Sequence, residues 1–429
     1  MHEAKKPGRT SPNWVYSVIP ASLAGGPLGT LIQLYLIQVN GPTLGTIYAS
    51  LAVAAFNGVS IPASMFWGYA TDRLRLRGAI MVGSYGSMAL ILFTFFFVSS
   101  TPGTILVFSA FSFMSAATAT PLNLLIMETE QKNRWAATFA RVSMMSSIGN
   151  VGGLVLSTVW AQWLPLILLS LPLGAFALVS AVLAFAFIRE PPFVFEGETI
   201  VRRAPSFFAL LLTLPLVFLK IPNLSDFRRV FRGLRSSLTR YMPLFYLSII
   251  CFYLSSGIFN TSFVPALSTF SLSAGEVFAI ILAGMVVQTF AFRYAGGYLA
   301  RRSLAYSSIQ GLLLRGGCYA ILGVLSVIAA GPVFVIPALV LYPIAAGIAF
   351  AAYYTSSNTM MFNSVQTRNP GSTLGVYSAV VGLATLAGSL ASGFMSVFLG
   401  FDVTFVSAGL LLFVGATILT KLPEPSEKL

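Results

Sequence analysis

The feature that most limits how this chain can fold is a series of long apolar segments that recurs along its whole length. An uninterrupted run of about 18 or more apolar residues is long enough to cross a bilayer as a helix. The runs are continuous rather than alternating, which excludes the strands of a membrane β-barrel. With 56% hydrophobic and only 9% charged residues, the chain has too few polar groups to cover a soluble protein of its size. The sequence therefore predicts an all-α membrane protein.

We expect twelve transmembrane helices from these segments. Glycine and proline inside several of them do not weaken this prediction, because neighbouring helices in a membrane bundle can satisfy the backbone groups that these residues leave free. In chain order, the predicted spans cover residues 14–38, 44–70, 79–98, 104–127, 136–160, 165–188, 241–270, 275–299, 307–329, 333–362, 373–399 and 403–419.

Lys and Arg are confined to alternate connections between these spans. The N-terminal tail, the connection after the second span, the middle region and the C-terminal tail are basic. The turns near residues 40, 101, 162, 273, 331 and 400 contain neither Lys nor Arg. This bias predicts a multi-pass protein of the cell membrane with both termini in the cytoplasm. It also accounts for the net charge of +13, so a nucleic-acid partner is not expected.

The chain divides into two bundles, a linker and two short tails. We predict a cytoplasmic tail over residues 1–13, a six-helix bundle over 14–189, a cytoplasmic linker over 190–240, a second six-helix bundle over 241–420 and a tail over 421–429. Within the linker, the apolar run 207–219 is too short to span and has basic residues on both flanks, which favours a position in the membrane interface. Residues 227–235 alternate aromatics with arginines, which is typical of a helix on anionic headgroups, with a solvated linker as the alternative.

A charge-dense stretch over residues 68–78 has a weaker copy in the second half of the chain. Gly68-Tyr69 is matched by Gly297-Tyr298, and the asparagine at position 123 is matched at position 358. We expect the first stretch to be a loop between the second and third spans. Self-similarity on the scale of a whole domain indicates two bundles that arose by duplication.

At these residues the chain resembles the major facilitator superfamily. Gly68, Asp72 and Arg73 match the pattern that this family carries between its second and third helices. Arg77 fits the basic tail of the pattern, while Arg75 replaces its second glycine. The resemblance implies two pseudo-symmetric six-helix bundles and a secondary transporter that works by alternating access. It also implies that Asp72 latches the bundles on the cytoplasmic side, with a plain topogenic charge cluster as the alternative.

Charged residues around the fourth and fifth spans are further candidates for a cytoplasmic gate. Glu128, Arg134 and Arg141 gather there, and Arg141 lies almost two turns into the fifth span, with Glu128 as its expected partner. The resemblance implies that such a network serves the gate, together with Gly297. Arg141 could instead snorkel to the headgroups. Arg315, in the ninth span, is expected to be structural or to face lipid.

Uncharged polar residues are the candidate solute ligands. In the helices that the resemblance places around the cavity, these are Gln33, Asn123, Asn260, Tyr353 and Asn358. The central parts of these helices carry no charge, and a charged solute would need a matching group there. We therefore predict a small neutral or weakly charged solute. Contacts between helices are the alternative role for each of these residues.

Missing motifs exclude other functions. The sequence has no HExxH motif, no Cys/His cluster and no phosphate loop, and its only histidine is His2, so we predict no enzyme activity, metal or cofactor. Cys251 and Cys318 lie in apolar segments, where we expect them to fill the core.

Three other functions remain open at this point. They are a proton-coupled exporter of amphipathic compounds, an anion transporter that uses Arg141, and a membrane receptor or scaffold that kept the fold. A coupled proton would pass through Glu128, the acid nearest to a span interior. We expect a monomer whose partners are a small-molecule solute, anionic lipid headgroups and, where transport is coupled, a proton.

Overall fold

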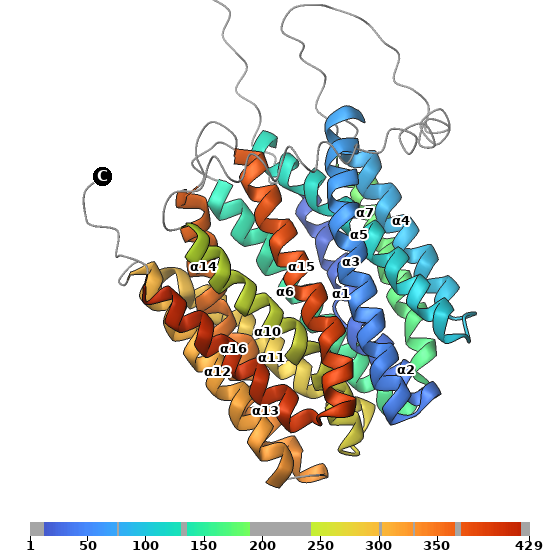
Figure 1. Cartoon of the computed structure of the whole chain (residues 1–429). Helices are drawn as coiled ribbons and strands as arrows, with labels where there is room; N and C mark the ends of the chain where they lie inside the picture. Colours follow the sequence, from blue (N-terminus) through green and yellow to red (C-terminus); the bar gives the residue numbers. More distant parts are fainter. Residues whose placement is uncertain are drawn as a thin grey trace, which may run out of the picture.

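The computed structural model describes residues 13–74, 77–129, 135–188, 242–299, 303–328, 331–364 and 370–421. The secondary structure in these ranges is entirely helical, and twelve stretches are long and apolar enough to cross a membrane. The helices stand side by side with similar tilts (Figure 1). The sequence-based prediction of an all-α membrane protein with twelve spans is confirmed.

Helices of the first half build six of these spans. The first span combines a 3-10 turn with two α-helices, and the sixth begins with a second 3-10 turn. In order, the elements are η1 (Asn13–Ser17), α1 (Val18–Gly25), α2 (Leu28–Asn40), α3 (Pro42–Leu74), α4 (Arg77–Phe95), α5 (Thr101–Thr129), α6 (Trp135–Trp163), η3 (Leu166–Leu169) and α7 (Ser170–Phe187).

The second half builds the other six spans. Its fourth span is composite, because a π-helix separates two α-helices within it. In order, the elements are α10 (Met242–Thr269), α11 (Ala274–Leu299), α12 (Leu304–Ile328), η4 (Pro332–Phe334), α13 (Val335–Pro343), η5 (Ile344–Ala349), α14 (Phe350–Ser364), α15 (Pro370–Phe398) and α16 (Phe401–Leu419).

Two ends of the molecule can be told apart by their connections. We call the end where α3 stops and α4 starts the basic end, and the end where α2 meets α3 at Gly41 the far end. Gly41, Gly331 and Gly400 have φ angles of 77°, 86° and 94°, which glycine adopts without strain. At the same end α11 begins with a capping box, in which Ser273 and Glu276 satisfy each other's backbone N–H groups. Local chemistry thus reverses the chain at the far end.

Helix pairing repeats between the two halves. The pair α1 and α6 corresponds to α10 and α15, and the pair α4 and α7 corresponds to α12 and α16. In the first pair, a Cβ at Gly149 would collide with the carbonyl oxygen of Ile19. In its counterpart, a Cβ at Gly388 would collide with the carbonyl oxygen of Leu254. Small residues therefore set the close approach of equivalent helices in both halves, as the fold of two pseudo-symmetric bundles requires.

The first span is broken, whereas its counterpart in the second half is not. Gly26 and Pro27 separate α1 from α2, and Pro27 has no N–H to donate to the preceding turn. A Cβ at Gly26 would lie 2.7 Å from Asn150 Oδ1 of α6, so this position accepts only glycine. The seventh span is the single helix α10, although it contains Pro265.

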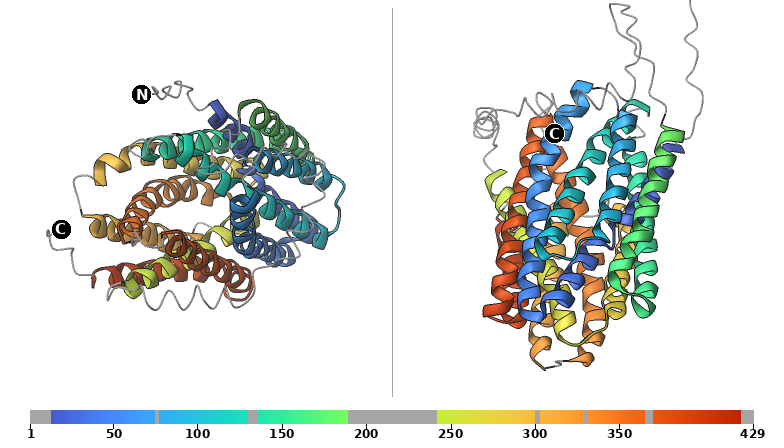
Figure 2. Two further views of the ribbon diagram at one scale, coloured as in Figure 1. Left: turned by 90° about the horizontal axis from the view of Figure 1, so that it is seen from above. Right: turned by 90° about the vertical axis from the view of Figure 1, so that its right-hand side faces the viewer.

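The two halves meet mainly through two helix pairs, α3 with α15 and α6 with α11, and α10 also contacts α2 and α3. Asn57 of α3 donates from Nδ2 to Ser389 Oγ of α15 at 3.2 Å. Nearer the far end, a Cβ at Gly393 would lie 2.6 Å from Ser50 Oγ. These contacts join the bundles from the far end to the middle of the molecule. Seen from above, the blue-to-green and yellow-to-red helices gather for the most part on opposite sides (Figure 2).

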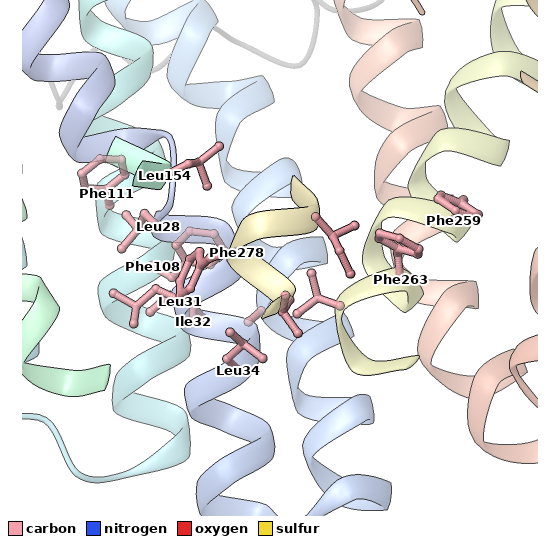
Figure 3. Packing of buried hydrophobic residues seen from close by; sticks show 14 of the residues in the cluster. Leu28, Leu31, Ile32, Leu34, Phe108, Phe111, Leu154, Phe259, Phe263 and Phe278 are labelled. Carbon is pink, nitrogen blue, oxygen red and sulfur yellow. The ribbon is translucent and has the colours of Figure 1, made fainter. Parts of the chain in front are cut away.

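Apolar packing continues across this boundary. One cluster of buried side chains includes Leu31 and Phe108 of the first half and Phe263 and Phe278 of the second (Figure 3). Cys251 and Cys318 are buried and free, as expected for core positions.

The charge-dense stretch is not the loop that the sequence suggested. Gly68, Asp72 and Arg73 lie in the last turns of α3, which continues to Leu74, and Arg77 is the first residue of α4. The apolar run ends near Gly68, but residues 69–74 contain neither glycine nor proline, so nothing stops the helix there. The linker over 190–240, its two predicted surface segments and Arg134 lie outside the described residues.

Candidate functional site

Polar aromatic side chains gather in the second half, where α10, α14 and α15 come together. Tyr377 of α15 donates from its hydroxyl to Asn358 Oδ1 of α14 at 3.2 Å. Tyr253 of α10 lies within side-chain hydrogen-bonding reach of Tyr377. Tyr354 of α14 is 41% exposed and stacks on Phe350, with their ring centroids 5.3 Å apart. We call the following residues the tyrosine cluster: Tyr253, Tyr353, Tyr354, Asn358 and Tyr377.

Helical spacing explains which members share a face. Tyr354 and Asn358 are four residues apart on α14, so both project on one side of that helix. Tyr253 and Asn260 are seven residues apart on α10, which again places them on one side, two turns apart. Asn260 is exposed. The faces that carry the cluster therefore offer hydroxyl and amide groups beside aromatic rings.

Tyr353 takes a different position from its neighbour Tyr354. It is 1% exposed, and its ring stacks on Phe252 at a centroid distance of 3.9 Å. Its buried hydroxyl lies within side-chain reach of the Ser248 hydroxyl of α10. Sequence reasoning chose Tyr353 as one of five candidate solute ligands, but Tyr354 is the more accessible of these two tyrosines. The four-residue spacing from Tyr354 to Asn358 is the sequence signal that could have identified it.

The remaining candidate ligands do not all join the cluster. Gln33 lies in α2 of the first half, is 6% exposed, and has an Oε1 atom without a partner among the described residues. Asn123 and Glu128 lie in α5, and the orientation of their side chains is not described.

The gate residues occupy the basic ends of several helices. Arg141 lies in α6 and donates from Nη2 to the hydroxyl of Tyr16 in η1 at 3.4 Å. Gly297 lies near the end of α11. The expected pairing of Arg141 with Glu128 stays a prediction, because it depends on a side chain outside the described set.

The sequence model of the Major Facilitator Superfamily matches residues 16–342 and 318–429 of this chain. The chain belongs to this superfamily. The structure of the nucleoside transporter NupG is similar at a TM-score of 0.68 and 15% identity, covering 96% of this chain and 99% of that one. A POT family transporter in complex with 5-aminolevulinic acid matches at 0.70 and 13% identity, covering 95% and 94%. An auto inhibited POT family peptide transporter matches at 0.69 and 10% identity, covering 97% and 98%.

No curated protein matches this chain in sequence. The solved structures share its fold, and together with the family match they identify a multi-pass membrane protein that acts as a secondary transporter. The predicted family, fold class and general function are thus confirmed, while the solute is left unspecified.

Sequence reasoning missed one feature of this transporter and left the position of another open. The first is a polar contact between the bundles, in which Ser389 Oγ accepts from Asn57 at 3.2 Å and from Thr261 Oγ1 at 3.1 Å. Asn57 is a polar residue in the middle of the second span, and that position could have marked it as a candidate. Serine and threonine are too common in helices of this kind to be selected without the structure.

The second feature is Arg315 in α12. It is 2% exposed and lies among aromatic rings of three helices, so the expectation that it could face lipid was wrong. The ninth span does lie at the side of its bundle, but a long side chain can reach inward past its own helix. The helix that carries a residue therefore does not decide which surface the charged group occupies.

Proposed function

We propose that this transporter binds a small neutral or weakly charged solute at the tyrosine cluster and moves it across the cell membrane by alternating access. The observation that carries this proposal is the contact of Tyr377 with Asn358, beside the accessible Tyr354. Aromatic walls with a few converging polar groups are what small-molecule sites usually offer. Hydroxyl and amide groups can donate and accept without requiring a charge on the solute.

One helix connects the proposed site to the contact between the bundles. Tyr377 lies near the basic end of α15, and Ser389, which accepts the hydrogen bond from Asn57, lies three turns further along the same helix. A solute that contacts Tyr377 therefore contacts α15, which also packs against α3 of the other bundle. That contact between the bundles changes when the far end opens. Binding can shift the equilibrium between the two states only through such differential contacts.

The basic end is the cytoplasmic end in this proposal, because Lys and Arg concentrate there. Asp72, Arg73 and Arg77 then form the cytoplasmic latch at the junction of α3 and α4. Glu128 is the route for any coupled proton, and Arg141 belongs to the same gate.

The experiment begins with a melting screen of the purified protein against neutral, cationic and anionic metabolites, because a ligand of the folded state raises its melting temperature. Counterflow of the best ligand in proteoliposomes then tests transport. Tyr377→Phe should weaken binding about fivefold through loss of one hydrogen bond. The matched control is Tyr35→Phe, whose hydroxyl makes a long contact of 3.4 Å to the Val98 carbonyl in the first half.

Equal binding by both variants would place the site elsewhere. A ligand that raises the melting temperature but shows no counterflow would favour the receptor alternative over transport.

A further inference from the structure

A charged side chain lies buried near the middle of the membrane. Arg315 is in the central part of α12, eleven residues after Leu304 and thirteen before Ile328. It is 2% exposed. Among the residues whose side chains the structure describes, it is the one charged residue that is buried. An ionisable group at this depth is costly and is functional by default.

Aromatic rings surround the guanidinium group. The Arg315 Cζ atom is 4.9 Å from the ring centroid of Phe252 on α10, 5.2 Å from that of Phe350 on α14 and 5.3 Å from that of Tyr319 on α12. Arg315 Nε donates to the Tyr319 hydroxyl at 2.6 Å. We call these four residues the arginine cage.

The cage does not complete the hydrogen bonding of Arg315. Its Nη1 atom is buried without a partner among the described residues. The acids with described side chains are Glu276 and Asp402, both in the first turns of far-end helices. Asp402 packs against Gly323, which is two turns, or about 12 Å, along α12 from Arg315.

Among the described residues, the aromatic rings leave one requirement of the buried Arg315 unmet, which is a hydrogen-bond acceptor for the N–H groups of Nη1. Cation–π contacts attract the guanidinium charge through the ring faces. They do not replace the hydrogen bonds that its N–H groups make in water, and an unpaired buried ion is costly. Rings cover the faces of the guanidinium plane, but they do not accept from the N–H groups along its edge. The missing component is an anion with oxygen acceptors in that plane.

We propose that Arg315 binds the carboxylate of a monoanionic solute with an aromatic or apolar body. A carboxylate matches the planar fork of arginine with two parallel hydrogen bonds. Two further polar groups in this part of the second half, the hydroxyls of Tyr353 and Ser248, are buried within side-chain reach of each other. The ring of Tyr353 stacks on Phe252, a ring of the arginine cage.

This inference rests on the proposed function and narrows its weakly charged solute to a carboxylate. Phe252 contacts Tyr253 at 5.0 Å, and Phe350 contacts Tyr354 at 5.3 Å, so the arginine cage and the tyrosine cluster share one aromatic wall. Phe252 and Tyr319 are fully buried, whereas Phe350 is half-buried. Phe350 is therefore the half-buried ring that contacts both Arg315 and the accessible Tyr354, and in this proposal its rotation opens the cage towards the cluster.

The test uses benzoate, an aromatic monocarboxylate, and benzamide, its neutral counterpart of the same shape. The melting temperature of the purified full chain is measured in each at constant ionic strength, with chloride as a third ligand. Benzoate should raise the melting temperature in a saturable way, and benzamide and chloride should not. Arg315→Gln should weaken benzoate binding about 10- to 100-fold. The matched control Arg293→Gln, at an exposed arginine of α11, should leave it unchanged.

The stability of the ligand-free variant separates binding from a purely structural role. An unpaired buried charge destabilises the protein, so Arg315→Gln should melt at the same temperature as the parent or higher. Should this variant fail to fold, Arg315→Lys keeps the charge but removes the fork, and its benzoate affinity should still fall about tenfold.

Several results would overturn the inference. They are equal stabilisation by benzamide, a response to chloride alone, and full benzoate binding by Arg315→Gln. Counterflow of a neutral solute without any benzoate effect would leave the proposed function intact and reject only the anion site. A benzoate effect without flux of any solute would keep the anion site and reject transport through the cluster.

Discussion

The two halves of this transporter share a scaffold but differ in what they hold. In the first half, aromatic contacts include separate pairs such as Tyr35 with Phe95, 5.5 Å apart, and Phe56 with Phe108, 4.5 Å apart. In the second half, rings form two longer series that meet at Arg315, one with Phe252 and Phe350 and the other with Phe259 stacked on Tyr319 at 3.6 Å. The first span of the first half is broken into two helices, whereas its counterpart is the single helix α10.

This difference indicates how a duplicated protein can divide its tasks. Close helix packing through glycine recurs in both halves, because each half must bury the same backbone surfaces without side chains between them. A transporter of this kind needs one solute-binding site at its centre. The residues that bind the solute can therefore lie in one half, while the other half forms the opposite wall of the site. Changes to the shared scaffold should therefore have the largest effects, followed by changes to the contacts between the halves and then by changes to the unequal ligands.

The largest effect should come from the shared scaffold. Gly149→Ala and Gly388→Ala each place a methyl group on a backbone carbonyl of the neighbouring helix, which cannot move aside as a flexible side chain would. Overpacking of this kind costs about 1–3 kcal/mol or more. We expect both variants to lose most of the monodisperse protein in size-exclusion chromatography. The matched control Gly152→Ala meets only Leu23 Cδ1 at 3.6 Å and should behave as the parent.

Normal yields of both variants would show that glycine is not what positions these helix pairs. Failure of one variant alone would show that the two halves differ even in their scaffold.

The next effect concerns the acid that only the first copy of the basic motif contains. Asp72→Asn should reduce counterflow about tenfold or more, because loss of a charge-assisted contact shifts the equilibrium between states by about 1.5–3 kcal/mol. Insertion into the membrane should be unchanged. Arg301, at the equivalent place in the second copy, provides the control Arg301→Gln, which should have a smaller effect. Parental flux in Asp72→Asn at equal expression would contradict the latch.

A smaller effect should follow from the polar contact between the halves. Ser389→Ala leaves the donors of Asn57 and Thr261 without their acceptor. This should destabilise the state in which the two bundles are in contact at the far end by about 1–3 kcal/mol. Ser50→Cys reports this change, because Ser50 is 2% exposed and lies against Gly393. Labelling of that cysteine by a membrane-impermeant maleimide should become about tenfold faster.

The reporter requires Cys251→Ser and Cys318→Ser, so that no native thiol reacts. The control Ser392→Ala removes a hydroxyl that donates to Ile258 within the second half, and its labelling rate should match the parent. Equal acceleration in both variants would mean that general loosening, rather than the contact between the halves, exposes the reporter.

The smallest effect is expected at two side-chain amides that occupy similar places in the two halves. Asn260 is exposed, whereas Gln33 is 6% exposed. Asn260→Ala should raise the KM for the transported solute about threefold to tenfold through loss of one hydrogen bond. Gln33→Leu should leave KM unchanged, since it removes a buried oxygen that has no partner among the described residues. The opposite ranking would move the solute contact into the first half.

Much of the architecture could be predicted because a bilayer imposes local rules. Each span must satisfy its own backbone hydrogen bonds and remain apolar, so length and composition were enough to locate all twelve spans. The main local error was the prediction of a loop from Gly68 to Gly78, because helix α3 continues to Leu74, beyond the end of its apolar run. The candidate site was less predictable, because a choice between Tyr353 and Tyr354 depends on how α14 is rotated about its axis.

By itself, the sequence determined the fold class, the family, the number of spans and the uneven placement of basic residues. Only the tertiary structure decided what the interior contains. The first, fourth, seventh and tenth spans carry no charge in their central parts, yet Arg315 reaches Phe252 and Phe350 of the seventh and tenth spans from the ninth. Spans are set by interactions within one segment, whereas the place of a long side chain depends on which neighbouring helices leave room for it.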